Sequence, residues 1–198
     1  MYILISLSLT FCRKRRVVSF FTSEGERVAS YKTLLRNTRS ILRSDPAMII
    51  SDGSRALRKA TDAIYPGIPF QYCLNHKLNL VRKHIKPELK PYFLSMYRMF
   101  SNSPTIMTSL CYFNNLRSFL IHHAPEAYPH LISNSDYLFT YHTQPSILHK
   151  QLKTNNLIES VNSQIRFSLN HAIYLQKSSS LKRGIFCLIK KINYSLQA

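Results

Sequence analysis

The order of strands and helices in the first third of the chain restricts the fold more than any other feature. Residues 47–51, AMIIS, form a short apolar run of the kind found in buried parallel strands, and residues 70–73, FQYC, form another. Residues 54–64 lie between them and carry their apolar side chains at helical spacing. A strand, a helix and a second strand in this order predict an α/β fold.

The first residues add a pair of strands to this unit. The apolar run MYILISLSLTF is followed by the basic run CRKRR. The apolar run is too short for a bilayer span, which takes about 20 residues, and a signal peptide carries its charge before the apolar run. Residues 2–9 and 17–21 are therefore predicted as two strands joined by a basic turn. A helix follows over residues 23–44, with capping-box spacing between Ser23 and Glu26.

The character of the sequence changes after this unit. Residues 75–150 show helical periodicity and little strand signal, and residues 156–170 and 181–196 are predicted as two further helices. We therefore expect an α/β domain that is interrupted by an all-helical insertion. The expected parts are residues 1–73 for the first part of the α/β domain, residues 74–152 for the insertion, and residues 153–198 for the closing helices.

The charge of the chain predicts a polyanionic partner. Lysine and arginine number 27, aspartate and glutamate 9, and the formal net charge is +18. Nucleic acid is the favoured partner of such a chain. An anionic membrane surface and a solvated basic surface without a partner are the alternatives. The four cysteines are widely scattered, which argues against a disulfide framework and favours a reducing compartment.

Asp52 is the first candidate for chemistry. It follows the apolar run of residues 47–51, at the carboxyl end of the predicted strand, where ligands bind in open α/β sheets. The structural alternative is that Asp52 caps the helix over residues 54–64, because aspartate is a favoured N-cap.

Glu159 is the second candidate, in the segment KTNNLIES at the start of a predicted helix. It lies about 100° from the apolar stripe of that helix. Asn162, Ser163 and Arg166 share its face, which would suit a phosphate backbone nearby. The structural alternative is a capping box with Asn156 as the N-cap and Glu159 three residues later.

Two carboxylates on separate elements of an α/β fold can form a site for a hard cation. Mg²⁺ prefers one or two carboxylates together with waters and substrate phosphates. Two such ions, roughly 3.5–4 Å apart, can stabilise the attacking and leaving oxygens of a phosphodiester displacement. In a strongly basic chain, this pair favours a nuclease or a strand transferase.

The pattern SDGSRALRKATDAIYPGIPFQYCLNH, followed by a helical stretch and then KTNNLIESVNSQIR, resembles the Mutator-type transposases. These include bacterial and archaeal insertion-sequence members and eukaryotic Mutator-like elements. In that family an aspartate ends a strand, as Asp52 does. A Cys-or-Asp-x-x-His motif, matched by Cys73 and His76, comes before an all-helical insertion. A TTN-like segment then introduces the helix with the last catalytic acid, matched by Glu159.

The resemblance implies the catalytic domain of a DDE transposase, with an RNase H-like mixed sheet. In such a domain two aspartates and a glutamate hold two divalent ions, Mg²⁺ or Mn²⁺, and water and then a DNA 3′-hydroxyl attack a phosphodiester. Asp52 would be the second acid and Glu159 the third, both as catalytic residues and as metal ligands. The first aspartate has no match, because the first acidic residue of the chain is Glu24.

We therefore expect a copy that lacks the first strand of the sheet, is truncated at its N-terminus and is inactive by itself. The alternatives are a non-catalytic DNA- or RNA-binding remnant of a transposase, and a basic nucleic-acid-binding module that resembles transposases by chance.

Cys73 and His76 form only half of a zinc site, because zinc takes four ligands and no second half stands at a usual spacing. Zinc is therefore not expected, and the resemblance favours a role in positioning. His122 and His123 follow the apolar stripe of an insertion helix and are expected to have no catalytic role.

The expected partner is DNA, as transposon ends and target. A homo-oligomer is left open, and no membrane is expected. The compartment would be the nucleoid-containing cytoplasm of a prokaryote or the nucleus of a eukaryote. The residues predicted to contact DNA surround the helix of Glu159 and are polar or basic: Lys153, Asn156, Arg166, Lys182, Arg183, Lys190 and Lys191.

Overall fold

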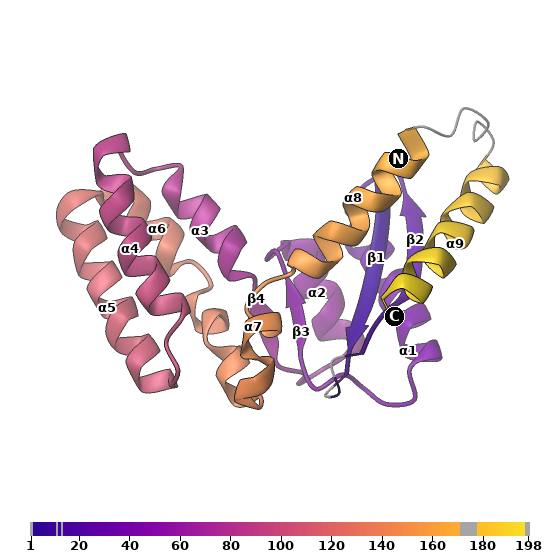
Figure 1. Ribbon diagram of the computed structural model, residues 1–198, viewed down its shortest axis with the longest axis horizontal. Coiled ribbons are helices and arrows are strands. Elements are labelled where there is room, and N and C mark those ends of the chain that lie inside the picture. The colour runs from indigo at the N-terminus through magenta and orange to yellow at the C-terminus, as the bar shows by residue number, and fades with distance from the viewer. Residues whose placement is uncertain (1, 11, 13, 171–177, 197–198) are drawn as a thin grey trace. The chain divides into compact units, whose positions relative to one another are not determined.

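The computed structural model describes residues 2–10, 12, 14–170 and 178–196 (Figure 1). The chain forms two compact units, and each is discontinuous in sequence. We call them the hairpin unit and the helical unit. The hairpin unit comprises Met1–Ala47, Ser54–Ile68 and Asn156–Ala198, and the helical unit comprises Met48–Gly53 and Pro69–Asn155.

The hairpin unit is built on two antiparallel strands, β1 (Tyr2–Leu9) and β2 (Arg15–Ser23). This confirms the predicted pair of strands. Ser6 is paired with Ser19, but Leu7 is paired with Val17, so Val18 is an additional residue in β2. Such a bulge changes which side chains of a strand face which side of the sheet.

Helix α1 (Val28–Ile41) covers one face of the hairpin, and α2 (Arg55–Ile64) packs against α1. The contact between the hairpin and α1 includes buried hydroxyl groups. Thr38 Oγ1 donates to Ser6 Oγ over 2.7 Å and lies 2.9 Å from Ser19 Oγ. Because hydroxyls of the strands and the helix satisfy one another, this face can be buried although it is partly polar.

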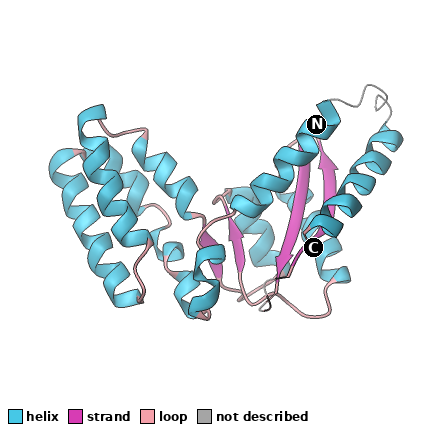
Figure 2. Ribbon diagram, in the orientation of Figure 1, coloured by secondary structure: helices cyan, strands magenta, loops and turns pink. Residues whose placement is uncertain are grey.

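Helices α8 (Asn156–Asn170) and α9 (Ser178–Ser195) cover the opposite face. In Figure 2 the two strands lie between helices on both sides. This second contact is apolar, and α9 adds a polar anchor: Val17 N donates to Asn193 Oδ1 over 2.7 Å, and Asn193 Nδ2 donates to Val17 O over 3.0 Å. The buried residues of this core are Ile5, Val17, Val161, Ile165, Ile185, Ile189 and Ile192.

The helical unit begins with a parallel pair of strands, β3 (Ile49–Ser51) and β4 (Phe70–Tyr72). Gln71 of β4 is fully buried and connects the pair to the rest of the unit. Its Oε1 accepts from Tyr141 N over 2.8 Å, and its Nε2 donates to Leu138 O over 3.3 Å.

The rest of the helical unit is helical. An aromatic core joins α4 and α5, in which Phe100 lies 5.5 Å from Phe113 and 5.7 Å from Phe139, measured between ring centroids. Short 3₁₀ turns connect several of the helices. The α-helices of the unit are α3 (Leu74–Arg82), α4 (Lys90–Ser101), α5 (Ile106–His123), α6 (Tyr128–Ile132) and α7 (His149–Leu152).

The predicted mixture of strands and helices is confirmed, but a single mixed sheet is not what the described residues form. They form two separate two-stranded sheets, one in each unit. The boundaries predicted at residues 73 and 152 remain a prediction. No helix in the described part of the chain is long and apolar enough to cross a membrane.

The predicted capping box at the start of the first helix is wrong. α1 begins at Val28, and its N-cap, Arg27, makes no capping hydrogen bond through its side chain. Ser23 Oγ instead donates to Gly25 O over 2.8 Å and lies 2.7 Å from Ser30 Oγ. The serine therefore closes the turn before the helix rather than capping the helix itself.

Candidate active-site residues and basic surface

Asp52 directly follows β3, as predicted, and its side chain is exposed. The capping alternative for this residue is wrong, because the N-cap of α2 is Ser54, whose Oγ accepts from Leu57 N over 3.4 Å. An exposed carboxylate at the carboxyl end of a parallel strand is well placed to bind a cation or a polar ligand.

The turn that carries Asp52 is fixed by Gly53 and Tyr72. Gly53 has a φ of +85°, and its N–H donates to Ser51 Oγ over 3.1 Å. A Cβ atom at this position would lie 2.0 Å from Cε2 of the Tyr72 ring. Only glycine can therefore adopt this backbone while the ring packs directly against it. Burial, followed by the charge of Asp52, raises the pKa of the Tyr72 hydroxyl.

Lys77 packs beneath Tyr72 and is 1% exposed. Its Nζ lies 4.8 Å from the centroid of the Tyr72 ring and donates to His130 O over 2.9 Å and to Ser133 O. These carbonyls are at the C-terminal end of α6, where the helix dipole favours a cation. Burial lowers the pKa of Lys77 to about 8. The turn of Asp52 is thus connected through an aromatic ring and a buried cation to α6.

Neither Tyr72 nor Lys77 was predicted from the sequence as part of the site. The only signal for Lys77 was its position immediately after the Cys73-x-x-His76 motif. Its burial depends on acceptors far away in the sequence, which no local pattern reveals.

Cys73 is fully buried and is the N-cap residue of α3. Its N–H donates to Ser51 O over 2.7 Å, which extends the pairing between the ends of β3 and β4. His76 lies half-buried in the first turn of α3. Cys73 therefore acts in the packing of the two strand ends beside Asp52. Over the residues that the structure describes, no three His, Cys, Asp or Glu side chains form a group that could hold a metal ion.

Glu159 lies in the first turn of α8, and its side chain is exposed. The predicted apolar stripe of this helix is confirmed, because Val161 and Ile165 are buried in the core of the hairpin unit. The N-terminal turn of a helix favours a carboxylate through the helix dipole. Asp52 belongs to the helical unit and Glu159 to the hairpin unit. That the two carboxylates form one cation site stays a prediction.

The solvent-facing sides of α8 and α9 carry most of the predicted DNA-contacting residues. Arg166, Lys182, Arg183, Lys190 and Lys191 are all exposed. Lys153 differs from them, because it belongs to the helical unit and is half-buried. Its Nζ lies 5.1 Å from the centroid of the Tyr141 ring, and burial lowers its pKa.

Exposed aromatic side chains, which were not predicted from the sequence, accompany these basic residues. They are Phe167, Phe186 and Tyr194, of which Tyr194 is 82% exposed. Lys190 Nζ lies 4.8 Å from the centroid of the Phe186 ring. Cations beside exposed aromatic rings are typical of surfaces that bind nucleic-acid strands, where rings stack on bases. The sequence signal for these residues is that they fall outside the apolar stripe of each helix.

Comparison with known proteins gives one family and one relative. The profile of the family described as "Transposase, Mutator family" matches residues 1–198. The chain is also 21% identical over 192 residues to the transposase for insertion sequence element IS905 of Lactococcus lactis subsp. lactis (strain IL1403). This match covers 96% of the chain and 48% of that transposase, so the chain spans about half the length of this relative.

The contact between Gly53 and Tyr72 can be tested against a second glycine with a positive φ. Gly67 has a φ of +79°, but a Cβ there would meet nothing within 4 Å. We expect Gly67→Ala to lower the free energy of unfolding by about 1 kcal/mol, from backbone strain alone. Gly53→Ala should lower the free energy of unfolding by about 3 kcal/mol or more, because the Tyr72 ring must also move. Urea unfolding measures both, and equal losses would contradict the contact.

The burial of Lys77 predicts how the free energy of unfolding depends on pH. Its pKa is about 8 in the folded protein, against an ordinary value of 10.5. Between these values the unfolded chain binds more protons at this residue. The free energy of unfolding should therefore rise with pH in this window, by up to about 1.4 kcal/mol per pH unit. Lys77→Met removes this contribution.

The measurement is the difference in unfolding free energy between the wild type and Lys77→Met from pH 8 to pH 10. Other titrating groups, including Tyr72, are present in both proteins and cancel to a first approximation. A difference that does not change over this range would show that Lys77 is not desolvated in solution.

Proposed function

Because the chain belongs to the Mutator family of transposases, we propose that it provides the catalytic region for DNA strand cleavage and transfer through divalent-metal chemistry. The observation that carries this proposal is the placement of Asp52. It is exposed at the carboxyl end of a parallel strand, on a turn held by Gly53 and Tyr72. The RNase H-like arrangement of the sheet is part of the proposal.

Asp52 and Glu159 are the residues that would hold Mg²⁺ or Mn²⁺, because exposed carboxylates beside substrate phosphates are the ligands that such ions prefer. Bound divalent ions supply a polarised water or 3′-hydroxyl and stabilise the leaving oxygen of the phosphodiester. Asp52 is held in place by its turn, which keeps its carboxylate at the strand end. Arg166 lies two helical turns after Glu159 on the same face of α8 and would contact the DNA backbone.

The exposed faces of α8 and α9 would bind the DNA. Lys182, Arg183, Lys190 and Lys191 supply cations for phosphates, and Phe186 and Tyr194 supply exposed rings for unstacked bases. A non-catalytic nucleic-acid-binding protein is the second candidate function. The basic and aromatic surface of α9 favours it, since that surface does not depend on either carboxylate.

The chemistry is tested by a strand-transfer assay with Mg²⁺ or Mn²⁺. No acidic residue lies on β1 or β2, and the resemblance matches only two of its three acids, Asp52 and Glu159, to this sequence. We expect no strand transfer by the 198-residue chain alone. We expect transfer by a version extended by a strand that carries an aspartate.

In the extended version, Asp52→Asn or Glu159→Gln should abolish transfer, because the lost carboxylate charge weakens metal binding. Asp62→Asn is the matched control, since Asp62 is an exposed carboxylate on α2 that is paired with Arg58 at 2.9 Å. Transfer by the 198-residue chain that disappears in Asp52→Asn would show that this chain already contains all the acids that transfer needs. Binding of DNA without transfer in every version would favour the second candidate.

DNA binding by the 198-residue chain should depend steeply on salt. Each neutralised phosphate of duplex DNA contributes about −0.9 to the slope of log affinity against log salt concentration. Lys182→Ala/Arg183→Ala should therefore make this slope shallower by about two such contributions. Titrations at several salt concentrations measure the slope. An affinity that does not depend on salt concentration, or a slope that the double substitution leaves unchanged, would rule out this surface as the DNA-binding site.

A further inference from the structure

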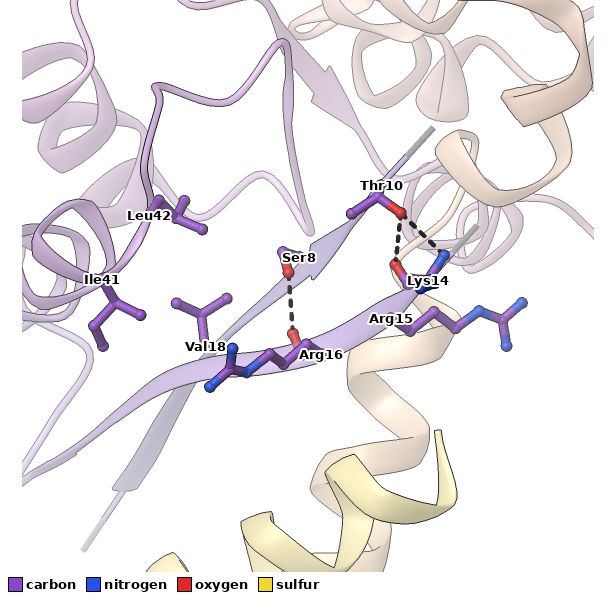
Figure 3. Close-up of a pocket in the computed structure, with 8 residues that line it drawn as sticks. All are labelled: Ser8, Thr10, Lys14, Arg15, Arg16, Val18, Ile41 and Leu42. Atoms are coloured by element: carbon purple, nitrogen blue, oxygen red, sulfur yellow. Dashed lines mark hydrogen bonds between the residues drawn. The ribbon is translucent and has the colours of Figure 1, made fainter. Parts of the chain in front are cut away.

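The tip of the hairpin carries a cavity that the catalytic proposal does not use. Figure 3 shows this cavity, which has a volume of about 280 Å³ and lies wholly within the hairpin unit. It is lined by residues of β1, β2, the turn between them, and the end of α1. They are Ser8, Thr10, Lys14, Arg15, Arg16, Val18, Ile41 and Leu42.

The two ends of the cavity differ in chemistry. Thr10, Lys14 and Arg15 lie at one end, and the apolar side chains of Val18, Ile41 and Leu42 lie at the other (Figure 3). Arg16 lies between them, and its side chain extends toward Val18. The apolar end is beside the last residue of α1, where helix carbonyls disfavour an anion. An anionic group would therefore bind between Lys14 and Arg16, with an apolar group beside α1.

The backbone around the cations is fixed by the hydroxyls. Thr10 N donates to Lys14 O over 2.9 Å, and Lys14 N donates to Thr10 Oγ1 over 3.1 Å. Ser8 Oγ donates to Arg16 O over 3.5 Å. These bonds use main-chain groups of Lys14 and Arg16, and the side-chain cations of both residues are exposed. The site therefore has two exposed cations whose own backbone is held by hydrogen bonds to Thr10 and Ser8.

The bulge at Val18 determines which side of β2 Arg16 occupies. Without the additional residue, Arg16 and Val18 would not lie on the α1 side of β2 together with Ser19. Lys14, Arg15 and Arg16 form no ion pair with any residue that the structure describes. Three successive cations without a carboxylate partner repel one another, and a bound anion would relieve this repulsion.

We propose that this cavity binds one nucleotide of a DNA strand, with the phosphate on Lys14 and Arg16 and the base or sugar on Val18, Ile41 and Leu42. The volume suits a single small ligand rather than a duplex. A phosphate next to a flat apolar group matches the two ends of the cavity better than an isolated carboxylate does. This inference rests on the proposed function, because the strand is the DNA on which the transposase would act.

The test is the binding of a short, fluorescently labelled single-stranded oligonucleotide to the 198-residue chain, followed by anisotropy. Lys14→Ala/Arg16→Ala should weaken binding by about tenfold or more at low salt and make the salt slope shallower by about 0.7 per lost phosphate contact. The matched control is Arg82→Ala/Lys83→Ala, which removes one arginine and one lysine that are exposed at the end of α3. A loss as large in the control would overturn the proposal.

A second pair of variants tests the apolar end without changing the hairpin. Ile41→Glu places a carboxylate beside the cavity, and Ile121→Glu on α5 is its control. The two isoleucines are 51% and 49% exposed, so neither substitution should unfold the chain. We expect only Ile41→Glu to weaken binding, and equal effects would overturn the assignment.

Competitors identify the ligand. A deoxynucleoside 5′-monophosphate should displace the oligonucleotide at a lower concentration than inorganic phosphate does, because it also uses the apolar end. Equal competition by inorganic phosphate would contradict a nucleotide site, and equal competition by polyglutamate would favour an acidic peptide. If the wild type fails to bind the oligonucleotide at low salt, the proposed function fails. If it binds and Lys14→Ala/Arg16→Ala behaves like its control, only the cavity assignment fails.

Discussion

The burial of both faces of one β-hairpin is the constraint on which the hairpin unit depends. Ile5 and Val17 pack into an apolar core with α8 and α9, while Ser6 and Ser19 meet Thr38 of α1 in a network of hydroxyls. Strand side chains alternate between faces, so the two kinds of contact must alternate along the sequence as well. The additional residue Val18 shifts this alternation once, which leaves Arg16 on the side of α1 and separates the basic tip from the apolar core.

In the helical unit, the buried cation of Lys77 is the interaction that helps to fix the turn with Asp52. Burying an ammonium group is costly unless its charge is stabilised by good acceptors. Lys77 finds two carbonyls at the end of α6 and the face of the Tyr72 ring, and burial still lowers its pKa. The same ring excludes any side chain at position 53. The backbone of the turn with Asp52 is therefore determined by packing several residues away, rather than by the local sequence alone.

Local patterns were sufficient to predict most elements and the position of Asp52 at a strand end, because periodicity and turn residues act over a few positions. They did not predict that Ser23 would bond to Gly25 and Ser30 instead of capping α1, since several nearby groups competed for one hydroxyl. They also missed Lys77, whose acceptors lie more than 50 residues away. The exposed rings of Phe186 and Tyr194 could have been found by asking which aromatic residues fall outside each apolar stripe. Asp52 and Glu159 belong to different units, and no local pattern contains the distance between them.

The pairing of Asn193 with the backbone of Val17 has a consequence for how the chain is made. The two residues are separated by 176 positions, so the core of the hairpin unit cannot close until α9 has been synthesised. Contacts between such distant segments form slowly, because a long loop must close before any of them is gained. During synthesis, the apolar face that holds Ile5 and Val17 therefore stays exposed until α9 has been made. An exposed apolar pair of strands is prone to aggregation. The hairpin unit therefore becomes a folded domain only after α9 is available to cover this face.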